Sequence, residues 1–268
     1  MTQLYRHPDG TVHHSLLKHF AFSPAHYRQA CIDAAEGKRK ATRAMNIGTI
    51  GHRLLLGERD GHRIVKYDGD RRGNAWKAFE AENDGADIVT AKEWAAAELV
   101  AQAVRDDAVA GPLLSGARYE VPLRWSDGSI ACATDGVDVI GRGFIADLKF
   151  TNSAEPLKFQ RHALNMAWPW QMAFYADGAI ANKIDIGMGV LLIAAECQPP
   201  HPVTVHMLDA ALLEHGRKTY RGWIERLRVC EENDYWPGYA NGILPFTLPP
   251  WLDENAAGIA GDDDEAAA

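Results

Sequence analysis

Residues 130–152, IACATDGVDVIGRGFIADLKFTN, decide the fold of this chain. β-Branched and small residues lead up to Gly141-Arg142-Gly143, a sequence typical of a tight turn between two strands. The second apolar segment, Phe144 to Phe150, is interrupted by two charged residues, Asp147 and Lys149. The sequence therefore predicts a β-hairpin whose second strand carries a carboxylate and an ammonium group.

Asp147 and Lys149 are two residues apart, so their side chains and that of Ile145 share one face of the strand. A carboxylate and an ammonium in an apolar strand are costly to bury unless they bind something. With the hairpin centred on Arg142, Asp135 is expected opposite Lys149 and on the same face.

Asp138 is the alternative acid on the first strand. It is three residues from Asp135, so the two carboxylates face opposite sides of a regular strand, and one of them is expected to bind a metal. The assumed register favours Asp135, whereas a one-residue slip of the hairpin would reverse the faces. Asp135 is the choice, and Asp138 stays open as the alternative.

The spacing of these residues, Asp135-x₁₁-Asp147-Leu148-Lys149, suits the hydrolysis of a phosphodiester. Carboxylates, waters and substrate phosphate are the ligands that Mg²⁺ prefers. A lysine two residues after a metal-binding aspartate stays on the same side of the strand as the metal, near the attacking water or the phosphate. A buried Asp–Lys ion pair is the alternative interpretation of so short a motif.

Composition sets outer limits on the function. The chain has 268 residues, 47% of them hydrophobic, and a formal net charge of −8, which argues against a generic nucleic-acid binder but allows a local basic channel. It has no apolar run of membrane-spanning length and no apolar signal region, so we expect a cytoplasmic protein without a membrane partner. The four cysteines form no CxxC pair and are expected to be reduced thiols.

Two basic segments are candidates for contacts with phosphate, although each could equally be a solvated surface. The candidate DNA-binding residues are Lys38, Arg39, Lys40 and Arg43 in the first segment and Arg71 and Arg72, close to Trp76, in the second.

Other polar residues lie at spacings that could bring them to the hairpin. Gly48 and His52 share one helical face, as do Gln171 and Tyr175. Glu120 lies on an expected first strand, at 118–125, whose proline suggests a sheet edge. Each of these side chains would be ordinary in isolation.

Helix-capping signals divide the chain into segments. Ser23-Pro24, the capping box Thr90 to Glu93, Trp168-Pro169 and Asp209 each predict the start of a helix, and the second of these helices is expected to end at Gly111-Pro112. We expect a single domain over residues 1–251. Its parts are a helical region at 13–115, a catalytic sheet at 116–207, and a C-terminal helix with a closing segment at 208–251, followed by a disordered acidic tail at 252–268.

Taken together, the motifs resemble the RecB-like branch of the PD-(D/E)xK nucleases, and more narrowly the exodeoxyribonuclease VIII (RecE-type) nuclease domain of phages and prophages. The resemblance spans Ser15 to Trp251. It rests on Gly48…His52, Glu120, Asp135, Asp147-Leu148-Lys149, Gln171…Tyr175, Ser23-Pro24-Ala25-His26-Tyr27 and Trp236-Pro237-Gly238-Tyr239. Thr134-Asp135 stands where Pro-Asp is usual, and Phe150 where threonine is common.

The resemblance implies an α/β (α+β) fold with a central mixed β-sheet of the restriction-endonuclease-like type, flanked by helices. It implies a Mg²⁺-dependent exonuclease, with Mn²⁺ as a substitute, that degrades the 5′-ended strand of double-stranded DNA. The resulting 3′ overhang would serve a single-strand annealing partner, and the enzyme is expected to form a homo-oligomeric ring. The cysteine spacing differs from that of the cluster-containing relatives, so no iron–sulfur cluster is expected.

The resemblance also implies roles for individual residues. The expected metal ligands are Asp135, Asp147 and the Leu148 carbonyl, completed by His52 and Glu120. Lys149 would position the water and stabilise charge on the phosphate, and Gln171 and Tyr175 would steady the lysine and the DNA strand. The alternatives are a structure-specific or restriction-like endonuclease and a non-catalytic DNA-binding protein with a vestigial site.

Overall fold

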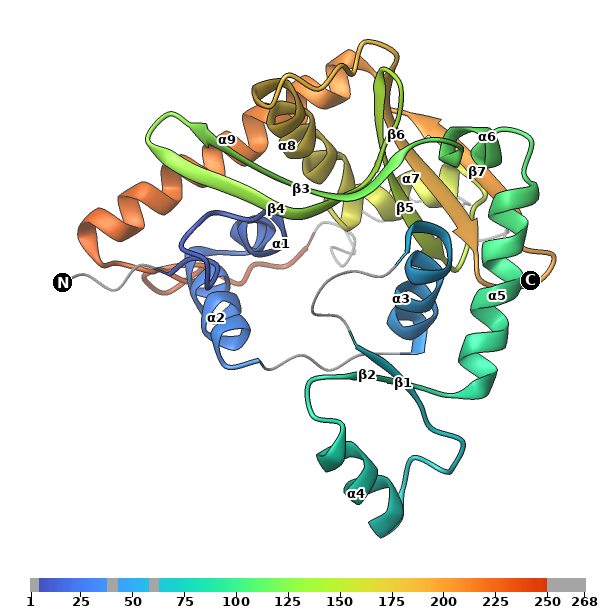
Figure 1. Cartoon of the computed structure of the whole chain (residues 1–268). Coiled ribbons are helices and arrows are strands. Elements are labelled where there is room, and N and C mark those ends of the chain that lie inside the picture. Colours follow the sequence, from blue (N-terminus) through green and yellow to red (C-terminus); the bar gives the residue numbers. More distant parts are fainter. Residues whose placement is uncertain (1–4, 38–42, 58–62, 250–268) are drawn as a thin grey trace, which may run out of the picture.

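The structure is a computed structural model that describes residues 5–37, 43–57 and 63–249, and its centre is a five-stranded mixed sheet with helices on both faces (Figure 1). The strands, in the order in which they lie in the sheet, are β3 (Arg118–Asp127), β4 (Ile130–Ile140), β5 (Phe144–Thr151), β6 (Gly189–Glu196) and β7 (Val203–Met207). The mixed α/β fold and the flanking helices are as predicted. The sheet edge formed by β3 agrees with its proline.

The helices precede, interrupt and follow the strands of the sheet. They are α1 (His14–Leu17), the 3₁₀ turn η1 (Lys18–Ala21), α2 (Pro24–Ala35), α3 (Arg43–Leu56), α4 (Gly73–Glu82), α5 (Ala91–Asp106), α6 (Ala110–Leu114), α7 (Pro156–Asn165), α8 (Trp168–Ala181) and α9 (Ala210–Asn233). No helix in the described part of the chain is both long and apolar enough to cross a membrane.

Strand direction follows from the connections. β4 runs antiparallel to both β3 and β5, and β6 and β7 form another antiparallel pair. β5 and β6 are parallel, and α7 and α8 provide the crossover between them. This central parallel pair is covered on both faces, which explains the continuous apolar character of β6.

Alternate side chains of β5 and β6 supply two different cores. Ile145 and Leu192 pack with residues of α7 and α8 on one face. Leu148 and Ile193 pack with residues of α5 and α6 on the other. The face that carries Ile145 also carries Asp147, so the acid faces the layer of α8.

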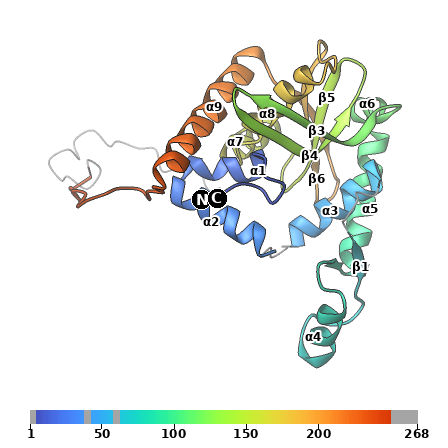
Figure 2. The same cartoon turned by 60° about the vertical axis from the view of Figure 1, so that its left-hand side comes forward.

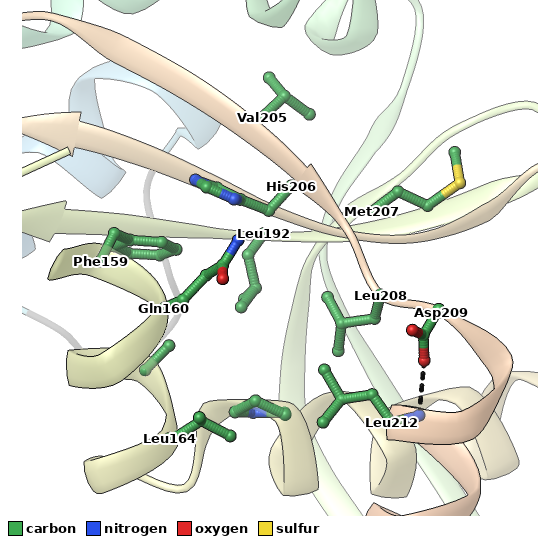
Figure 3. Close-up of a pocket in the computed structure, with 12 residues that line it drawn as sticks. Phe159, Gln160, Leu164, Leu192, Val205, His206, Met207, Leu208, Asp209 and Leu212 are labelled. Atoms are coloured by element: carbon green, nitrogen blue, oxygen red, sulfur yellow. Dashed lines mark hydrogen bonds between the residues drawn. The ribbon is translucent and has the colours of Figure 1, made fainter. Parts of the chain in front are cut away.

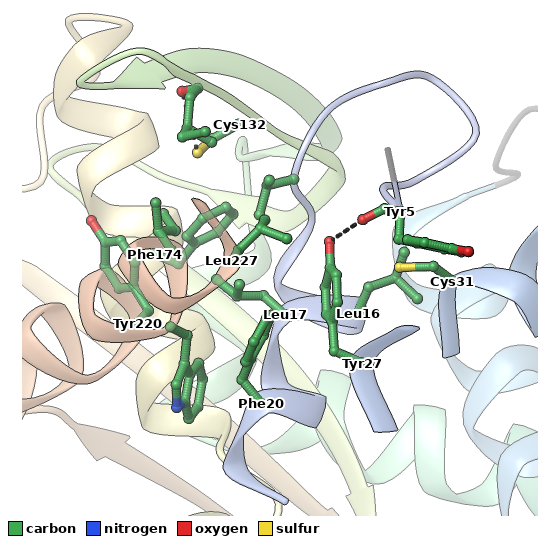
Figure 4. Packing of buried hydrophobic residues seen from close by; sticks show 14 of the residues in the cluster. Tyr5, Leu16, Leu17, Phe20, Tyr27, Cys31, Cys132, Phe174, Tyr220 and Leu227 are labelled. Atoms are coloured by element: carbon green, nitrogen blue, oxygen red, sulfur yellow. Dashed lines mark hydrogen bonds between the residues drawn. The ribbon is translucent and has the colours of Figure 1, made fainter. Parts of the chain in front are cut away.

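The N-terminal helices are anchored to the rest of the fold by a separate apolar cluster (Figure 4). Tyr27 of α2 and Phe20 of η1 are almost fully buried and lie 4.5 Å apart between ring centroids. The Tyr27 hydroxyl donates to the Tyr5 carbonyl oxygen at 2.7 Å. Tyr220 of α9 and Phe174 of α8 complete this packing, so residues 5–35 are tied to the C-terminal helix.

The predicted capping signals are confirmed. Ser23 accepts a hydrogen bond from the His26 N–H at the start of α2, and Asp209 accepts one from Leu212 at the start of α9. Thr90 and Glu93 form a reciprocal capping box on α5.

One helix boundary was predicted wrongly. The helix that starts after the capping box ends at Asp106, and Gly111-Pro112 lies inside the separate short helix α6. Asp107 explains the break, because its carboxylate accepts the N–H groups of Val109 and Ala110 and so opens a new helical turn.

A small extension leaves the main body between α3 and α5 (Figure 2). It consists of α4 and two short parallel strands, β1 (Ile64–Lys66) and β2 (Asp87–Val89). After α9, Trp236 packs edge-on against Tyr5, whereas Ile243 and Phe246 are fully exposed. The expected closing segment therefore covers the core only at its beginning, and the residues of the expected acidic tail lie outside the described part of the chain.

Close approach of α3 to β5 depends on Gly51. A Cβ atom at this position would lie 2.1 Å from the Cζ atom of the Phe150 ring. We expect Gly51→Ala to lower the free energy of unfolding by roughly 1–3 kcal/mol, because the ring and the helix must separate. Gly222 on the exposed face of α9 is the matched control, since a Cβ there meets nothing within 4 Å. Gly222→Ala should be neutral or slightly stabilising in the same denaturant titration, and equal losses in both variants would contradict the role of Gly51.

Candidate active site

The hairpin register places Asp138, and not Asp135, opposite Asp147. The β4–β5 ladder contains the pairs Val139↔Ala146 and Ile140↔Ile145, which puts the preceding residue Asp138 opposite Asp147. The predicted register was therefore wrong by one residue.

The turn explains this error. The Gly141 N–H donates to the Phe144 carbonyl oxygen at 3.0 Å, so the loop consists of Arg142 and Gly143 alone, with Gly143 at a φ of 81°. The prediction had assumed a loop of three residues centred on Arg142. Asp135 instead lies beside His13, with 3.7 Å between the His13 Nδ1 and Asp135 Oδ1 atoms.

Asp138 lies where β4 and β5 part. Its Oδ2 atom accepts the backbone N–H of Leu148 at 2.8 Å, so a side chain takes the place of a backbone partner at this point of the sheet. Asp138 and Asp147 are both buried, with 8% and 2% of their surface exposed. Two acids from adjoining strands are thus held together out of contact with bulk water.

Glu120 adds a third carboxylate from the neighbouring strand. The pairs Tyr119↔Val139 and Val121↔Val137 flank it, which places Glu120 opposite Asp138. Its φ is 47°, in the left-handed region that a glutamate rarely adopts. Gly136 makes room for it, since a Cβ there would lie 2.5 Å from the Glu120 Oε2 atom.

His52 reaches the same place from α3. Its Nε2 atom is 3.0 Å from the Leu148 carbonyl oxygen. Its Nδ1 atom is 3.6 Å from Asp138 Oδ2 and 3.8 Å from Glu120 Oε1. One ligand atom from each of His52, Glu120 and Asp138 lies within 4.8 Å of the others, a spacing that a bound cation could draw together.

Lys149 lies beside these acids on the α8 side. Its Nζ atom forms an ion pair with Asp147 Oδ2 and donates to Gln171 Oε1 at 3.3 Å. The Gln171 amide donates in turn to Asp147 Oδ1 at 3.3 Å and to the Tyr175 hydroxyl at 2.9 Å. The glutamine therefore bridges the acid and the lysine, as its position on the helix had suggested.

The buried acids carry more negative charge than the protein neutralises. Burial, followed by repulsion from Asp147, raises the pKa of Asp138 to about 7. Burial alone would lower the pKa of His52, but the negative charge of Asp138 and a hydrogen bond that the imidazole donates to Glu120 raise it. A divalent cation would offset this repulsion, so the donor set of carboxylates, a carbonyl and an imidazole fits such an ion.

Two residues around Lys149 were missed by sequence reasoning. The Nζ atom lies 5.0 Å from the centroid of the Trp168 ring, a cation–π arrangement. His14 of α1 is buried, and this burial, with the positive charges of Lys18 and Lys149, lowers its pKa to about 3. The sequence signalled Trp168 only as the start of a helix, and it gave no signal for His14.

The structure separates the predicted DNA-binding residues. Arg71 donates to Glu93 Oε2 at 2.7 Å and to the Ile88 carbonyl oxygen, so it ties the β1–β2 extension to α5. Arg72 is exposed and pairs with Asp70 at 2.9 Å. Tyr175 packs among core residues next to the site. The basic residues at 38–40 lie outside the described part of the chain, as does the side chain of Arg43.

A pocket of about 440 Å³ lies elsewhere, between α7, β7 and the start of α9 (Figure 3). Phe159, Leu164 and Leu212 give it an apolar wall, and Asp209 at its rim is used in capping α9. None of the three carboxylates described above lines it. The acidic cluster, and not this pocket, has the chemistry expected from the sequence.

A profile described as "PDDEXK-like domain of unknown function (DUF3799)" matches residues 13–244, most of the chain. The chain belongs to this PDDEXK-like family. The resemblance to the PD-(D/E)xK superfamily is thereby confirmed, and membership supports a nuclease.

A solved structure shares the fold of this PDDEXK-like protein. It is a "putative exonuclease" from Eubacterium rectale, with a TM-score of 0.61 and 14% sequence identity, and the match covers 94% of each chain. At this identity the similarity concerns the fold. No curated protein sequence matches the chain.

The raised pKa of Asp138 has a measurable consequence for stability. Because the folded state holds this proton up to about pH 7 and the unfolded state releases it near pH 4, wild-type stability falls as the pH rises between these values. Asp138→Asn removes the buried charge and keeps an oxygen that can accept the Leu148 N–H. In metal-free buffer at pH 8 we expect the variant to be more stable by roughly 1–3 kcal/mol, and the advantage to shrink toward pH 5.

Denaturant titrations at pH 5 and pH 8 in the presence of a chelator measure this difference. Asp106→Asn, an exposed acid on α5, is the control and should change stability little at either pH. A lower stability of Asp138→Asn at pH 8 would show that the cost of burying the Asp138 charge beside Asp147 is smaller than the value of its contacts.

Proposed function

We propose that this protein is a divalent-metal-dependent deoxyribonuclease that hydrolyses phosphodiester bonds at the acidic cluster where β4 and β5 separate. The observation that supports this most strongly is the meeting of Asp138 and Asp147 beside the Asp147–Lys149 ion pair, on adjoining strands. A lone Asp–Lys ion pair would need no second buried acid, and the burial and repulsion that raise the pKa of Asp138 would then be an unrelieved cost.

The metal site is assigned to Asp138, Asp147 and the Leu148 carbonyl, with His52 and Glu120 beside them. A bound Mg²⁺, or Mn²⁺ as a substitute, would activate water and offset the negative charge that develops on the phosphate. Oxygen ligands predominate in this set, which suits Mg²⁺. Asp135, the ligand expected at first, has no place in this proposal because of its position beside His13.

Lys149 is assigned the role of holding the attacking water and stabilising the phosphate. Gln171 holds the Lys149 ammonium at 3.3 Å, and the Trp168 ring lies under it, so its position is fixed before substrate arrives. The hydrogen bond from Gln171 to Asp147 fixes the carboxylate relative to the same ammonium. Gln171 is therefore a positioning residue, and Tyr175 supports it from the core.

We further propose that the enzyme is an exonuclease on double-stranded DNA ends that proceeds 5′ to 3′ and leaves a 3′ overhang for a single-strand annealing protein. The RecE-type resemblance of the motifs supports this, as does the fold shared with a "putative exonuclease". A homo-oligomeric ring around DNA belongs to the same proposal. The exposed Arg72 on the extension is a candidate contact to the DNA backbone.

Substitutions at the ion pair should separate rate from metal binding. We expect Lys149→Ala to lower kcat by about 10²–10³-fold while leaving the affinity for Mg²⁺ nearly unchanged, since the lysine is no metal ligand. Asp147→Ala should lose both activity and Mg²⁺ affinity. Lys218→Ala, an exposed lysine on α9, is the control and should retain both. Equal loss of Mg²⁺ affinity in the first two variants would contradict the assignment.

Duplexes labelled at one 5′ or 3′ end test the direction and the need for an end. We expect Mg²⁺-dependent early release of the 5′ label from linear duplex and no cleavage of the closed-circular form, because an exonuclease starts at an end. Cleavage of the circle would identify an endonuclease instead. If Mg²⁺ yields no cleavage of any duplex with the wild-type protein, the nuclease proposal itself fails.

A further inference from the structure

A second cluster of metal-ligating side chains forms where the N-terminal segment joins β4. The Val12 N–H donates to the Ala131 carbonyl oxygen at 2.9 Å, and the Ala133 N–H donates to the Val12 carbonyl oxygen at 3.0 Å. This short parallel pairing places residues that precede α1 against β4. Asp135, which the catalytic site does not use, lies at this junction.

Two histidines and this aspartate converge there. The rings of His7 and His13 stack with their centroids 3.8 Å apart and their planes inclined by 23°. His13 is 4% exposed, and its Nδ1 atom is 3.7 Å from Asp135 Oδ1. One ligand atom from each of the three side chains lies within 4.8 Å of the other two.

Asp9 lies against both imidazoles and forms a hydrogen bond with that of His13. Its carboxylate oxygens lie 3.0 Å from His7 Nδ1 and 3.2 Å from His13 Nε2. Asp9 is itself fixed by the backbone N–H and hydroxyl of Thr11 and by Arg124 at 3.0 Å. A carboxylate that accepts one ring N–H of a histidine sets the tautomer and leaves the other nitrogen unprotonated for a metal. For His13 that other nitrogen is Nδ1, the atom that faces Asp135.

We propose that His7, His13 and Asp135 form a binding site for a transition-metal dication of the Zn²⁺ type, separate from the catalytic centre, with Asp9 orienting the two imidazoles. Two imidazoles and one carboxylate are a usual set for zinc, whereas Mg²⁺ selects oxygen ligands. Bonds of about 2.0–2.1 Å in tetrahedral geometry place ligand atoms roughly 3.3 Å apart. The 3.7 Å between His13 and Asp135 therefore requires a small contraction, which the half-exposed Asp135 side chain can provide. The His7 ring, whose ligand atom lies within 4.8 Å of the other two, would have to turn out of its stack with His13 to direct a nitrogen at the same ion.

The ion would tie the N-terminal segment to β4. His7 and Asp135 are far apart in sequence, so a shared ligand closes a long loop, and the folded state becomes more stable as the logarithm of the ion concentration rises above the Kd. Asp138 lies three residues after Asp135 on the same strand, and α1 begins directly after His13. The bound ion would thus hold in place the strand that carries the catalytic acid.

Co²⁺ is a suitable probe because its visible absorption reports both binding and geometry. The protein used is full-length Asp138→Asn, in which the catalytic cluster lacks one acid, in excess Mg²⁺. We expect it to bind one Co²⁺ with the absorption of a four-coordinate site. Adding His7→Asn or Asp135→Asn to this background should abolish that absorption.

Thermal unfolding supplies a second readout. Zn²⁺ should raise the unfolding temperature of Asp138→Asn protein by roughly 5 °C, and the shift should be absent from the two double variants. Unfolding temperatures measured in chelator show whether the added substitutions disturb the fold. Asp135 is exposed, so its substitution should disturb the fold less than that of His7. Absence of Co²⁺ binding in Asp138→Asn protein, or retention of it in both double variants, would overturn the proposal.

Discussion

A buried carboxylate accepting a backbone N–H is the constraint on which the centre of this structure depends. Where β4 and β5 part, Asp138 accepts the Leu148 N–H that would otherwise lie unsatisfied beside the sheet. The same contact turns the Leu148 carbonyl toward His52 and brings Asp138 next to Asp147. The separation of two strands would usually weaken a sheet. Here it leaves space for charged side chains in the interior of the sheet.

Side chains from helices on both faces of the sheet contact the acids where β4 and β5 separate. From one side α3 brings His52, and its approach is possible because Gly51 lies against the Phe150 ring. From the other side α8 brings Gln171, which bridges the Asp147 carboxylate and the Lys149 ammonium. The positive charges of His52 and Lys149 lower the pKa of Asp138, whereas burial and repulsion from Asp147 raise it more, so that it stays above its usual value. The buried carboxylates therefore carry an electrostatic cost that a bound cation would offset.

Much of this could be predicted from the sequence, because local patterns determine it. Period-two spacing put Asp147 and Lys149 on one face, and capping residues located the starts of α2, α5 and α9. The register of the hairpin could not be predicted, because Gly-Arg-Gly is compatible with loops of two or three residues. This difference of one residue in loop length places Asp138, and not Asp135, beside Asp147. The left-handed backbone of Glu120 depends on Gly136 across the strand pair, a contact that no local pattern reveals.

In the observed register, Asp135 and Asp138 lie on one strand but have different surroundings. Asp138 lies beside further carboxylates and the His52 imidazole, which in turn contacts the Leu148 carbonyl oxygen, so oxygen ligands predominate there. Asp135 meets two stacked imidazoles held by Asp9. Because hard oxygen ligands favour Mg²⁺ and imidazoles favour Zn²⁺, the two positions would bind different cations although they lie on the same strand. A strand that carries acids three residues apart can thus serve two kinds of metal chemistry, provided that the elements on its two sides supply different partners.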